Sequence, residues 1–132
     1  MDHACYCVVL RKMSRRLTSL YDEALEPFGI NVSQFSHLRN IRSRAPVSVT
    51  ELAQMLELDR STVGRNTKVL QRMGLVHVVP GEDQRESTLV LTEKALELLA
   101  ATTPVWREVQ KRVEKSVDPL LLDRLMDDLR AV

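Results

Sequence analysis

Hydrophobic positions recur at helical spacing in two neighbouring segments, 49–56 and 60–73, with a tight turn between them. Ser48 lies three residues before Glu51, as in a capping box, so the first of these helices should begin at Val49. In both segments the apolar side chains form one stripe and leave the opposite face polar. Two short amphipathic helices joined in this way are typical of a helix-turn-helix.

A β-hairpin is predicted directly after the second helix. Asp59 is a suitable N-cap for that helix, and Gly74 is the glycine that should end it. The stretches 76–79 (VHVV) and 87–91 (STLVL) are rich in β-prone residues, and a charged loop separates them. A helix-turn-helix followed by such a hairpin is a winged helix-turn-helix, in which one helix reads a DNA groove and the hairpin tip probes the next.

Further helices are predicted on both sides of this segment. From periodicity, capping residues and prolines they are expected at about 4–26, from Ser33 to Arg44, from Thr92 to Ser116 with a bend at Pro104, and from Pro119 onwards. The 132 residues should therefore form a single domain, 1–132, that is mainly α with a small β-hairpin wing. Within it, a winged helix-turn-helix lobe at about 32–92 should join a helical dimerisation layer at about 4–26 and 93–132.

Composition excludes several classes of protein. No apolar run approaches the roughly 18 residues of a membrane span, and the N-terminus lacks a signal-peptide pattern. Two cysteines in such a chain indicate a reducing compartment, so we expect a cytoplasmic protein. A Gly-rich phosphate loop and a G-x-S-x-G motif are both missing, and the three histidines lie far apart. We therefore expect neither an enzyme nor a cofactor.

The net charge of +1 conceals an uneven distribution. Within 60–85 five basic residues accompany two acidic ones, whereas 114–130 holds five acidic and three basic residues. The polar side chains of the second helix and of the hairpin tip are of the kinds that bind phosphates and base edges in double-stranded DNA. The predicted DNA-binding residues are Arg60, Ser61, Thr62, Arg65, Asn66 and Lys68 on the helix, with Asp83 and Arg85 on the hairpin tip.

Four positions on or near this surface carry more specific expectations. Arg85 should enter a minor groove, where negative potential attracts it, and Asp83 should orient Arg85 or another arginine. Gly64 lies in the middle of the second helix, where glycine costs about 0.5–1 kcal/mol relative to alanine. Either close approach to DNA or simple tolerance of glycine on an exposed face would explain it. We interpret Arg39, on the helix predicted from Ser33 to Arg44, as part of a solvated face.

The last predicted helix has more leucine than a monomer of this size can easily bury, at Leu120, Leu121, Leu122, Leu125 and Leu129. Such a surplus usually marks a partner surface. In a two-fold homodimer the two recognition helices lie about one DNA turn apart and read a palindromic operator. The rest of the dimerisation layer is predicted to include Val8, Val9, Met13, Leu17, Leu96, Leu99, Val105, Trp106 and Val109.

The order of these motifs resembles that of the MarR (multiple-antibiotic-resistance-type) family of regulators over nearly the whole chain. The matching motifs are Met73-Gly74-Leu75-Val76, Asp83-Gln84-Arg85 and Leu91-Thr92-Glu93-Lys94, and residues 5–38 are similar to the N-terminal region of many members. The resemblance implies a dimeric transcriptional repressor that a small aromatic ligand releases from DNA. The candidate pocket residues are Tyr21, Phe28, Phe35, His37 and Trp106.

The N-terminal cysteines are a separate question. Some hydroperoxide-sensing members of that family have a cysteine where Cys7 stands, judged by its spacing to Tyr21, but a second expected tyrosine is replaced by Arg11. Spaced i, i+2 on a helix, Cys5 and Cys7 should point to different sides and not bridge each other readily. Together with His3 they match no common zinc signature, so no metal is expected.

Two alternatives to a ligand-released repressor therefore stay open. One is a repressor that senses hydroperoxide or thiol redox state through Cys7. The other is a winged-helix protein-interaction module that no longer binds DNA. A module of that kind would be expected to lack the basic and amide side chains at Arg65, Asn66, Lys68 and Arg85, and this chain retains all four.

Overall fold

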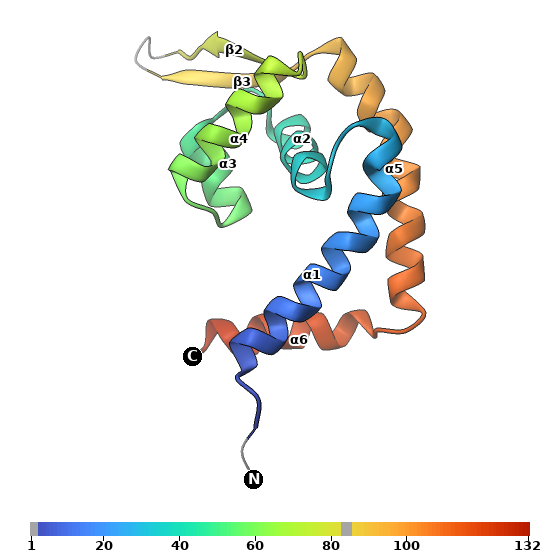
Figure 1. The fold of residues 1–132 in the computed structure, drawn as a ribbon. Helices are drawn as coiled ribbons and strands as arrows, with labels where there is room; N and C mark the ends of the chain where they lie inside the picture. The colour runs from blue at the N-terminus through green and yellow to red at the C-terminus, as the bar shows by residue number, and fades with distance from the viewer. Residues whose placement is uncertain (1–2, 83–85) are drawn as a thin grey trace.

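The computed structural model describes residues 3–82 and 86–132. Its helices and strands, in chain order, are α1 (Tyr6–Leu25), the 3₁₀ turn η1 (Glu26–Phe28), α2 (Val32–Arg44), β1 (Val47–Ser48), α3 (Val49–Leu56), α4 (Arg60–Arg72), β2 (Val76–Pro80), β3 (Ser87–Leu91), α5 (Glu93–Glu114) and α6 (Pro119–Arg130). Figure 1 shows both chain termini at the end of the molecule opposite the hairpin. None of the helices in the described ranges is long and apolar enough to span a membrane.

The lobe farthest from the termini is a winged helix-turn-helix, as predicted. Helices α2, α3 and α4 pack together, and α4 leads into the β2–β3 hairpin (Figure 1). The sheet has three antiparallel strands in the order β1-β3-β2, with Leu89 of β3 opposite both Val47 and Val78. The sequence predicted only the hairpin, because β1 is two residues long and shows no periodicity.

The core of this lobe is apolar and continues toward the helical layer. The side chains that form it are almost fully buried, and the largest of them are Phe35, Leu25, Leu38, Ile41, Leu52, Leu70, Leu75 and Leu99. They come from both the winged lobe and the flanking helices, so the two parts of the chain share one hydrophobic core. This packing fixes α4 relative to the rest of the protein.

Capping residues begin most of the helices where the sequence predicted. The side chains of Ser48, Thr92 and Asp118 accept backbone hydrogen bonds at the starts of α3, α5 and α6. The prediction for α2 was wrong, because Asn31 caps it instead of Ser33, by exchanging reciprocal hydrogen bonds with Gln34. Ser33 lies inside the first turn, where its side chain cannot take that role.

The residues at the two ends of α4 agree with the predicted capping roles to different extents. Asp59 stands at the N-cap position, but its side chain makes no capping hydrogen bond. Gly74 follows the helix with φ 76°, the left-handed conformation that favours glycine at this position. The predicted end of α4 is therefore confirmed, whereas the predicted cap is right in position only.

The second part of the molecule consists of α1, α5 and α6. Helix α1 packs along α5, and α6 follows α5 at the end of the molecule where the chain termini lie (Figure 1). Pro104 lies inside α5, as predicted. No residue of α6 is buried, and Leu120 and Leu121 are 73% and 59% exposed. The chain on its own therefore leaves the apolar face of α6 uncovered.

Part of the predicted dimerisation layer is internal to the chain. Leu99 and Val109 are 0% and 2% exposed, so they cannot contact a partner and that prediction was wrong. Helical spacing showed that α5 has an apolar stripe but not that the same chain covers most of it. Val8, Met13 and Leu96 are exposed, as a partner surface requires.

Candidate nucleic-acid interface

Four of the predicted DNA-binding residues lie along the exposed side of α4. Arg60, Ser61, Arg65 and Lys68 are all exposed in the chain. The opposite side of the helix is anchored in the core by three buried side chains, Val63, Thr67 and Leu70. The helical repeat therefore directs the apolar and small residues inward and leaves the cationic row facing solvent.

Hydrogen bonds hold two of these arginines in place. Arg60 Nε donates to Thr50 Oγ1 on α3 at 3.0 Å. Arg65 Nη2 donates to Thr62 Oγ1, one turn earlier on α4, at 3.4 Å. Thr62 is half-buried and thus supports Arg65 instead of extending the exposed row. Sequence spacing could not predict the contact of Arg60 with Thr50, because this contact joins two helices.

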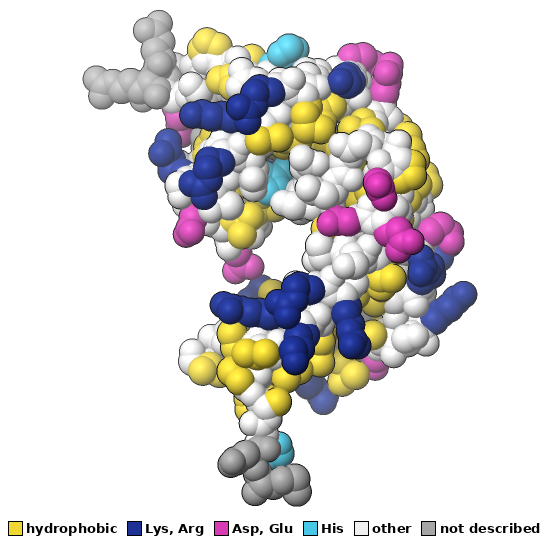
Figure 2. Space-filling view, viewed as in Figure 1, with side chains coloured by type: hydrophobic (Ala, Val, Ile, Leu, Met, Phe, Trp, Pro, Cys, Tyr) yellow, Lys and Arg dark blue, Asp and Glu magenta, His cyan; other side chains and the backbone are white. Residues whose placement is uncertain are grey.

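A groove runs between α4 and the hairpin, with a cavity volume of about 510 Å³. Its lining residues from α3 and α4 are Val49, Arg60, Ser61, Gly64, Arg65, Thr67, Lys68 and Gln71, and those from the hairpin are Val78, Ser87 and Leu89. Figure 2 shows Lys and Arg side chains gathered over the part of the surface that α3 and α4 form. The groove thus combines a cationic wall with polar hydroxyl and amide groups.

The cations of this groove are not neutralised by described neighbours. The ion pairs found among residues 3–82 and 86–132 are Lys111–Glu108 and Arg130–Asp127, both at 3.6 Å and both on the helical layer. Neither pair involves α4. A row of cations that forms no ion pair among the described residues is suited to binding a polyanion, since phosphates can then replace water and counterions around it.

The hairpin tip is described only at its base. Asp83 and Arg85, both predicted to bind DNA, lie outside the described residues. At the base, the Gly81 N–H donates to the carbonyl oxygen of Glu86 at 2.7 Å. A Cβ at position 81 would lie 2.7 Å from that same oxygen, so the tight crossing of the two chain segments requires glycine.

Asn66 is directed differently from the exposed row. Its Nδ2 lies 3.3 Å from Nε2 of His37 on α2, and its side chain is half-buried. The sequence grouped it with the arginines because the two types of side chain often bind DNA together. The structure instead places it at the contact between α2 and α4.

His37 is buried and belongs to this contact. It is 1% exposed, and its Nδ1 lies 2.7 Å from the carbonyl oxygen of Ser33. Burial lowers the pKa of the imidazole below its ordinary value of 6.5, and the bond to Ser33 opposes this effect in part. The ring therefore lies against α4 in its neutral form at neutral pH.

Gly64 has open space around it. A Cβ built at this position would have no neighbouring atom within 4 Å. Packing within the chain therefore does not require glycine there. Both of the explanations that the sequence left open, close approach to DNA and simple tolerance, remain consistent with this finding.

The five candidate ligand-pocket residues do not surround a common cavity. Phe35 and Trp106 do come together, with ring centroids 5.7 Å apart and an interplanar angle of 29°. Arg39 is not merely solvated, because its guanidinium carbon lies 4.2 Å from the centre of a Trp106 ring. These three side chains line a groove of about 490 Å³, together with Val32, Ser36, Asn40 and Ser43.

The remaining candidates lie elsewhere. The Tyr21 hydroxyl donates a hydrogen bond to Oε1 of Gln110, beside a separate cavity of about 240 Å³ between α1, α5 and α6. Burial, and to a lesser extent the charge of Glu114, raises the pKa of Tyr21 above 10.0. Phe28 is 36% exposed on η1, and His37 faces α4 as described. Spatial grouping of this kind was beyond what sequence spacing could predict.

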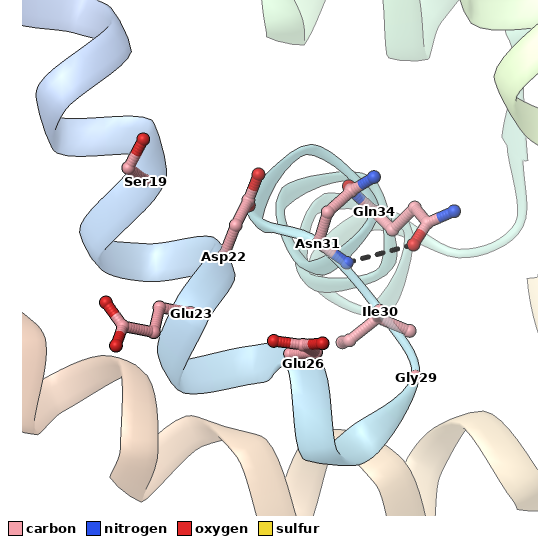
Figure 3. Close-up of a pocket in the computed structure, with 8 residues that line it drawn as sticks. All are labelled: Ser19, Asp22, Glu23, Glu26, Gly29, Ile30, Asn31 and Gln34. Atoms are coloured by element: carbon pink, nitrogen blue, oxygen red, sulfur yellow. Dashed lines mark hydrogen bonds between the residues drawn. The ribbon is translucent and has the colours of Figure 1, made fainter.

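A fourth hollow, of about 630 Å³, lies where α1 turns into α2 (Figure 3). Its lining includes the carboxylates of Asp22, Glu23 and Glu26. Asp22 Oδ1 accepts a hydrogen bond from the backbone N–H of Val32 at 2.8 Å, so this carboxylate has a structural task in fixing the start of α2. The negative lining makes this surface unsuitable for DNA.

Both cysteines are exposed free thiols at the start of α1. Cys5 is the N-cap residue of α1, so of the two cysteines Cys7 lies within the helix and Cys5 lies just before it. The prediction that both cysteines lie on one helix was therefore wrong. Tyr21, which the hydroperoxide sensors would place near such a thiol, lies 14 residues farther along the same helix and bonds to Gln110. Within 3–82 and 86–132, no three His, Cys, Asp or Glu side chains cluster in a way that could hold a metal ion.

Comparison with known proteins agrees with this geometry. A family model described as MarR family matches residues 28–86. The uncharacterized HTH-type transcriptional regulator YwoH of Bacillus subtilis is 31% identical over 122 residues, which cover 92% of this chain and 84% of that protein. The M. tuberculosis transcriptional regulator MosR, in a crystal structure with DNA, has 37% identity and a TM-score of 0.87, with coverage of 96% of this chain and 93% of MosR.

One more distant structure shows the same fold. It is Bordetella bronchiseptica BpsR, whose DNA binding is regulated by 6-hydroxynicotinic acid. It has a TM-score of 0.84 over 99% of this chain and 96% of BpsR. At 18% identity this likeness concerns the fold alone.

Proposed function

The chain belongs to the MarR family of winged helix-turn-helix transcriptional regulators, and on that premise we propose that it is a homodimeric repressor of a palindromic operator. The members of this family are regulators of transcription and not enzymes. The observation that carries the proposal is the exposed row of Arg60, Ser61, Arg65 and Lys68 on α4, beside a groove of about 510 Å³. In this proposal α4 reads a major groove of the DNA, and the hairpin reaches the adjacent minor groove through Arg85.

The uncovered apolar face of α6 supports the proposed homodimer. Six apolar side chains of this helix are exposed by 38–73%, namely Leu120, Leu121, Leu122, Leu125, Met126 and Leu129. Val8 and Met13 on α1 extend the apolar surface. A second copy of the chain would remove these side chains from water, at about 25 cal/mol for each Å² of apolar area buried. The resulting two-fold symmetry would give two recognition helices and hence a palindromic site.

The groove lined by Phe35, Arg39 and Trp106 is the proposed site of the releasing ligand. Its volume of about 490 Å³ lies within the range typical of small-molecule sites. Two stacked aromatic rings can pack against a planar ligand, and the guanidinium of Arg39 can pair with a carboxylate. These features favour a small aromatic acid that binds between α2 and α5 and weakens DNA binding.

Selection from a pool of random DNA duplexes tests the operator proposal. The wild-type protein should enrich a palindrome whose half-sites lie about one helical turn apart, at about 10 base pairs. Arg65→Ala should enrich weakly or not at all, whereas Gln54→Ala, on the exposed part of α3, should enrich the same palindrome. Failure of the wild type to enrich any sequence would sink the proposal and favour the protein-interaction module instead.

Titration with aromatic acids then tests the ligand site. A bound ligand should lower operator affinity and quench the fluorescence of Trp106, which is the only tryptophan in the chain. Arg39→Gln should weaken the response to a carboxylate ligand and leave operator affinity without ligand unchanged. If the wild type and Arg39→Gln respond equally to every acid that releases DNA, this groove is not the ligand site.

Redox release through Cys7 is a second candidate, favoured by the exposure of its thiol. Hydroperoxide can reach an exposed thiolate and oxidise it to sulfenic acid. Mild hydroperoxide should then release the wild-type protein from its operator, and Cys7→Ser should stay bound. Release of both proteins at the same peroxide concentration would remove Cys7 from the mechanism.

A further inference from the structure

The contact between His37 and Asn66 links the recognition helix to a titratable group that is almost fully buried. His37 is on α2 and Asn66 is on α4, the helix that has the exposed cationic row. The distance between His37 Nε2 and Asn66 Nδ2 is 3.3 Å, and that between His37 Nδ1 and the Ser33 carbonyl oxygen is 2.7 Å. The predicted ligand-pocket role of His37 does not account for either contact.

The two contacts determine which ring nitrogen has the proton. A carbonyl oxygen can only accept, so Nδ1 must be the N–H that donates to Ser33. In the neutral ring Nε2 is then an acceptor, and the amide N–H of Asn66 donates to it. In the opposite orientation of the Asn66 amide, its Oδ1 would face His37 Nε2, and two acceptors would then lie against each other. Neutral His37 therefore fixes the Asn66 amide in one of its two orientations.

We infer that His37 is a positioning residue of the DNA interface, which holds Asn66 and the recognition helix in the arrangement that binds the operator. In this arrangement one N–H of the Asn66 amide bonds to His37. The second N–H and the Oδ1 acceptor of Asn66 are then available to bind DNA. Protonation of Nε2 would bring two donors face to face, so the amide would have to turn over or move away. Either change would alter the position of Asn66 on α4, while the charges of Arg60, Arg65 and Lys68 would stay the same. The inference rests on the proposed function, since it concerns how the chain binds DNA.

The surroundings make His37 the group that responds to pH at this contact. A small cavity of about 110 Å³ beside it is lined by Asn31, Ser33, Gln34, His37, Asn66, Val69 and Leu70, from α2 with its N-cap and from α4, and none of these residues is charged. No carboxylate in this lining can compensate a protonated ring. Burial keeps the pKa of His37 below 6.5, so the contact is intact at neutral pH and is lost on acidification.

The test compares operator affinity between about pH 5 and about pH 8 in three variants. His37→Gln keeps an acceptor for Asn66 but does not titrate, His37→Leu offers no acceptor, and His3→Gln is a matched control at an exposed histidine. His77, on the hairpin, is present in all of them. The wild type and His3→Gln should both lose affinity on acidification, by about three- to tenfold beyond any loss in His37→Gln.

The variants should also differ at neutral pH. His37→Gln should bind there within about threefold of the wild type, whereas His37→Leu should bind about three- to tenfold more weakly at every pH. Circular dichroism should show all variants folded over the range compared. The inference is overturned if His37→Gln loses affinity on acidification as the wild type does, or if His37→Leu binds as tightly as the wild type.

A measurement without DNA separates this inference from the proposed function. ¹⁵N NMR of the imidazole should show His37 with its proton on Nδ1 at neutral pH, and Asn66→Ala should shift the Nε2 signal. A proton on Nε2 at neutral pH would refute the contact itself. If the NMR result is as expected but the wild type binds no DNA selectively at any pH, the proposed function fails, and the role of His37 at DNA fails with it.

Discussion

Helices α4 and α6 are both short and amphipathic, but they differ in which face is left exposed in the single chain. Helix α4 has 13 residues and buries Val63, Thr67 and Leu70, so its polar face is the one left exposed. Helix α6 has 12 residues and buries none, so its apolar face is exposed as well. The first helix is complete within one chain and presents charge to a partner. The second is incomplete within one chain and presents hydrophobic area.

This difference separates two requirements of a DNA-binding dimer. In the proposed dimer, specificity for one half-site depends on groups that α4 holds in place, such as Arg65 with its hydrogen bond to Thr62. In the proposed dimer, occupancy of two half-sites depends on α6 and the start of α1, which would have no direct part in reading DNA. Substitutions in the two helices should therefore affect binding in different ways, and the predictions below use that contrast.

The largest expected effect comes from charge on the apolar face of α6. Leu121→Glu with Leu125→Glu should prevent the second copy from packing there, because buried carboxylates without partners are strongly unfavourable. Analytical ultracentrifugation should show a monomer, and affinity for the palindrome should fall by about a hundredfold or more as one half-site is lost. Asp128→Asn, on the polar face of the same helix, should remain a dimer. A double variant that stays dimeric would locate the interface elsewhere.

Removing a cation from α4 should reduce specific binding while leaving the dimer intact. Arg65→Ala should cost about 1–3 kcal/mol on the operator if the guanidinium reads a base. Fluorescence anisotropy with single-base variants of the operator should show that discrimination is relaxed at one position in each half-site. Unchanged operator affinity would exclude Arg65 from base reading.

A smaller and less specific effect is expected at the hairpin tip. Arg85→Ala should lower affinity for all sequences alike and reduce the salt dependence of binding by about one phosphate contact. The measurement is the slope of log affinity against log salt concentration for operator and random DNA. A loss confined to one operator base would contradict a backbone or minor-groove role for Arg85.

The smallest effect is expected at Gly64, where the effect on stability and the effect on binding can be measured separately. Gly64→Ala has open space for its methyl group and should stabilise the fold by about 0.5–1 kcal/mol in thermal unfolding. If α4 approaches DNA closely at this position, the same methyl group should weaken operator binding. A stabilised protein with unchanged affinity would show that glycine is simply tolerated there.

Local signals in the sequence were sufficient for most of the fold. Pro119 after Asp118 began α6 correctly, and Gly74 ended α4, because capping depends on residues within one turn. The sequence failed where two caps competed, at Asn31 and Ser33, and where an element was too short to show a period, at β1. It also could not tell that the chain itself buries part of the apolar stripe of α5.

Only the part of the candidate site that lies on a single helix could be predicted from the sequence. The helical repeat places Arg60, Arg65 and Lys68 on one side of α4, so the cationic row could be inferred from spacing. The direction of Asn66 depends on His37, which is 29 residues away on another helix. The pairing of Arg39 with Trp106 likewise depends on how α2 and α5 pack. Contacts between elements of this kind have no signature in sequence spacing.

Fluorescence anisotropy on the selected palindrome is the most direct test of the division between α4 and α6. At fixed salt concentration, two chains should bind each duplex, scrambled DNA should not displace them, and a duplex with only one half-site should bind far more weakly. Equal affinity for the palindrome, the half-site and scrambled DNA would contradict both the reading role of α4 and the joining role of α6.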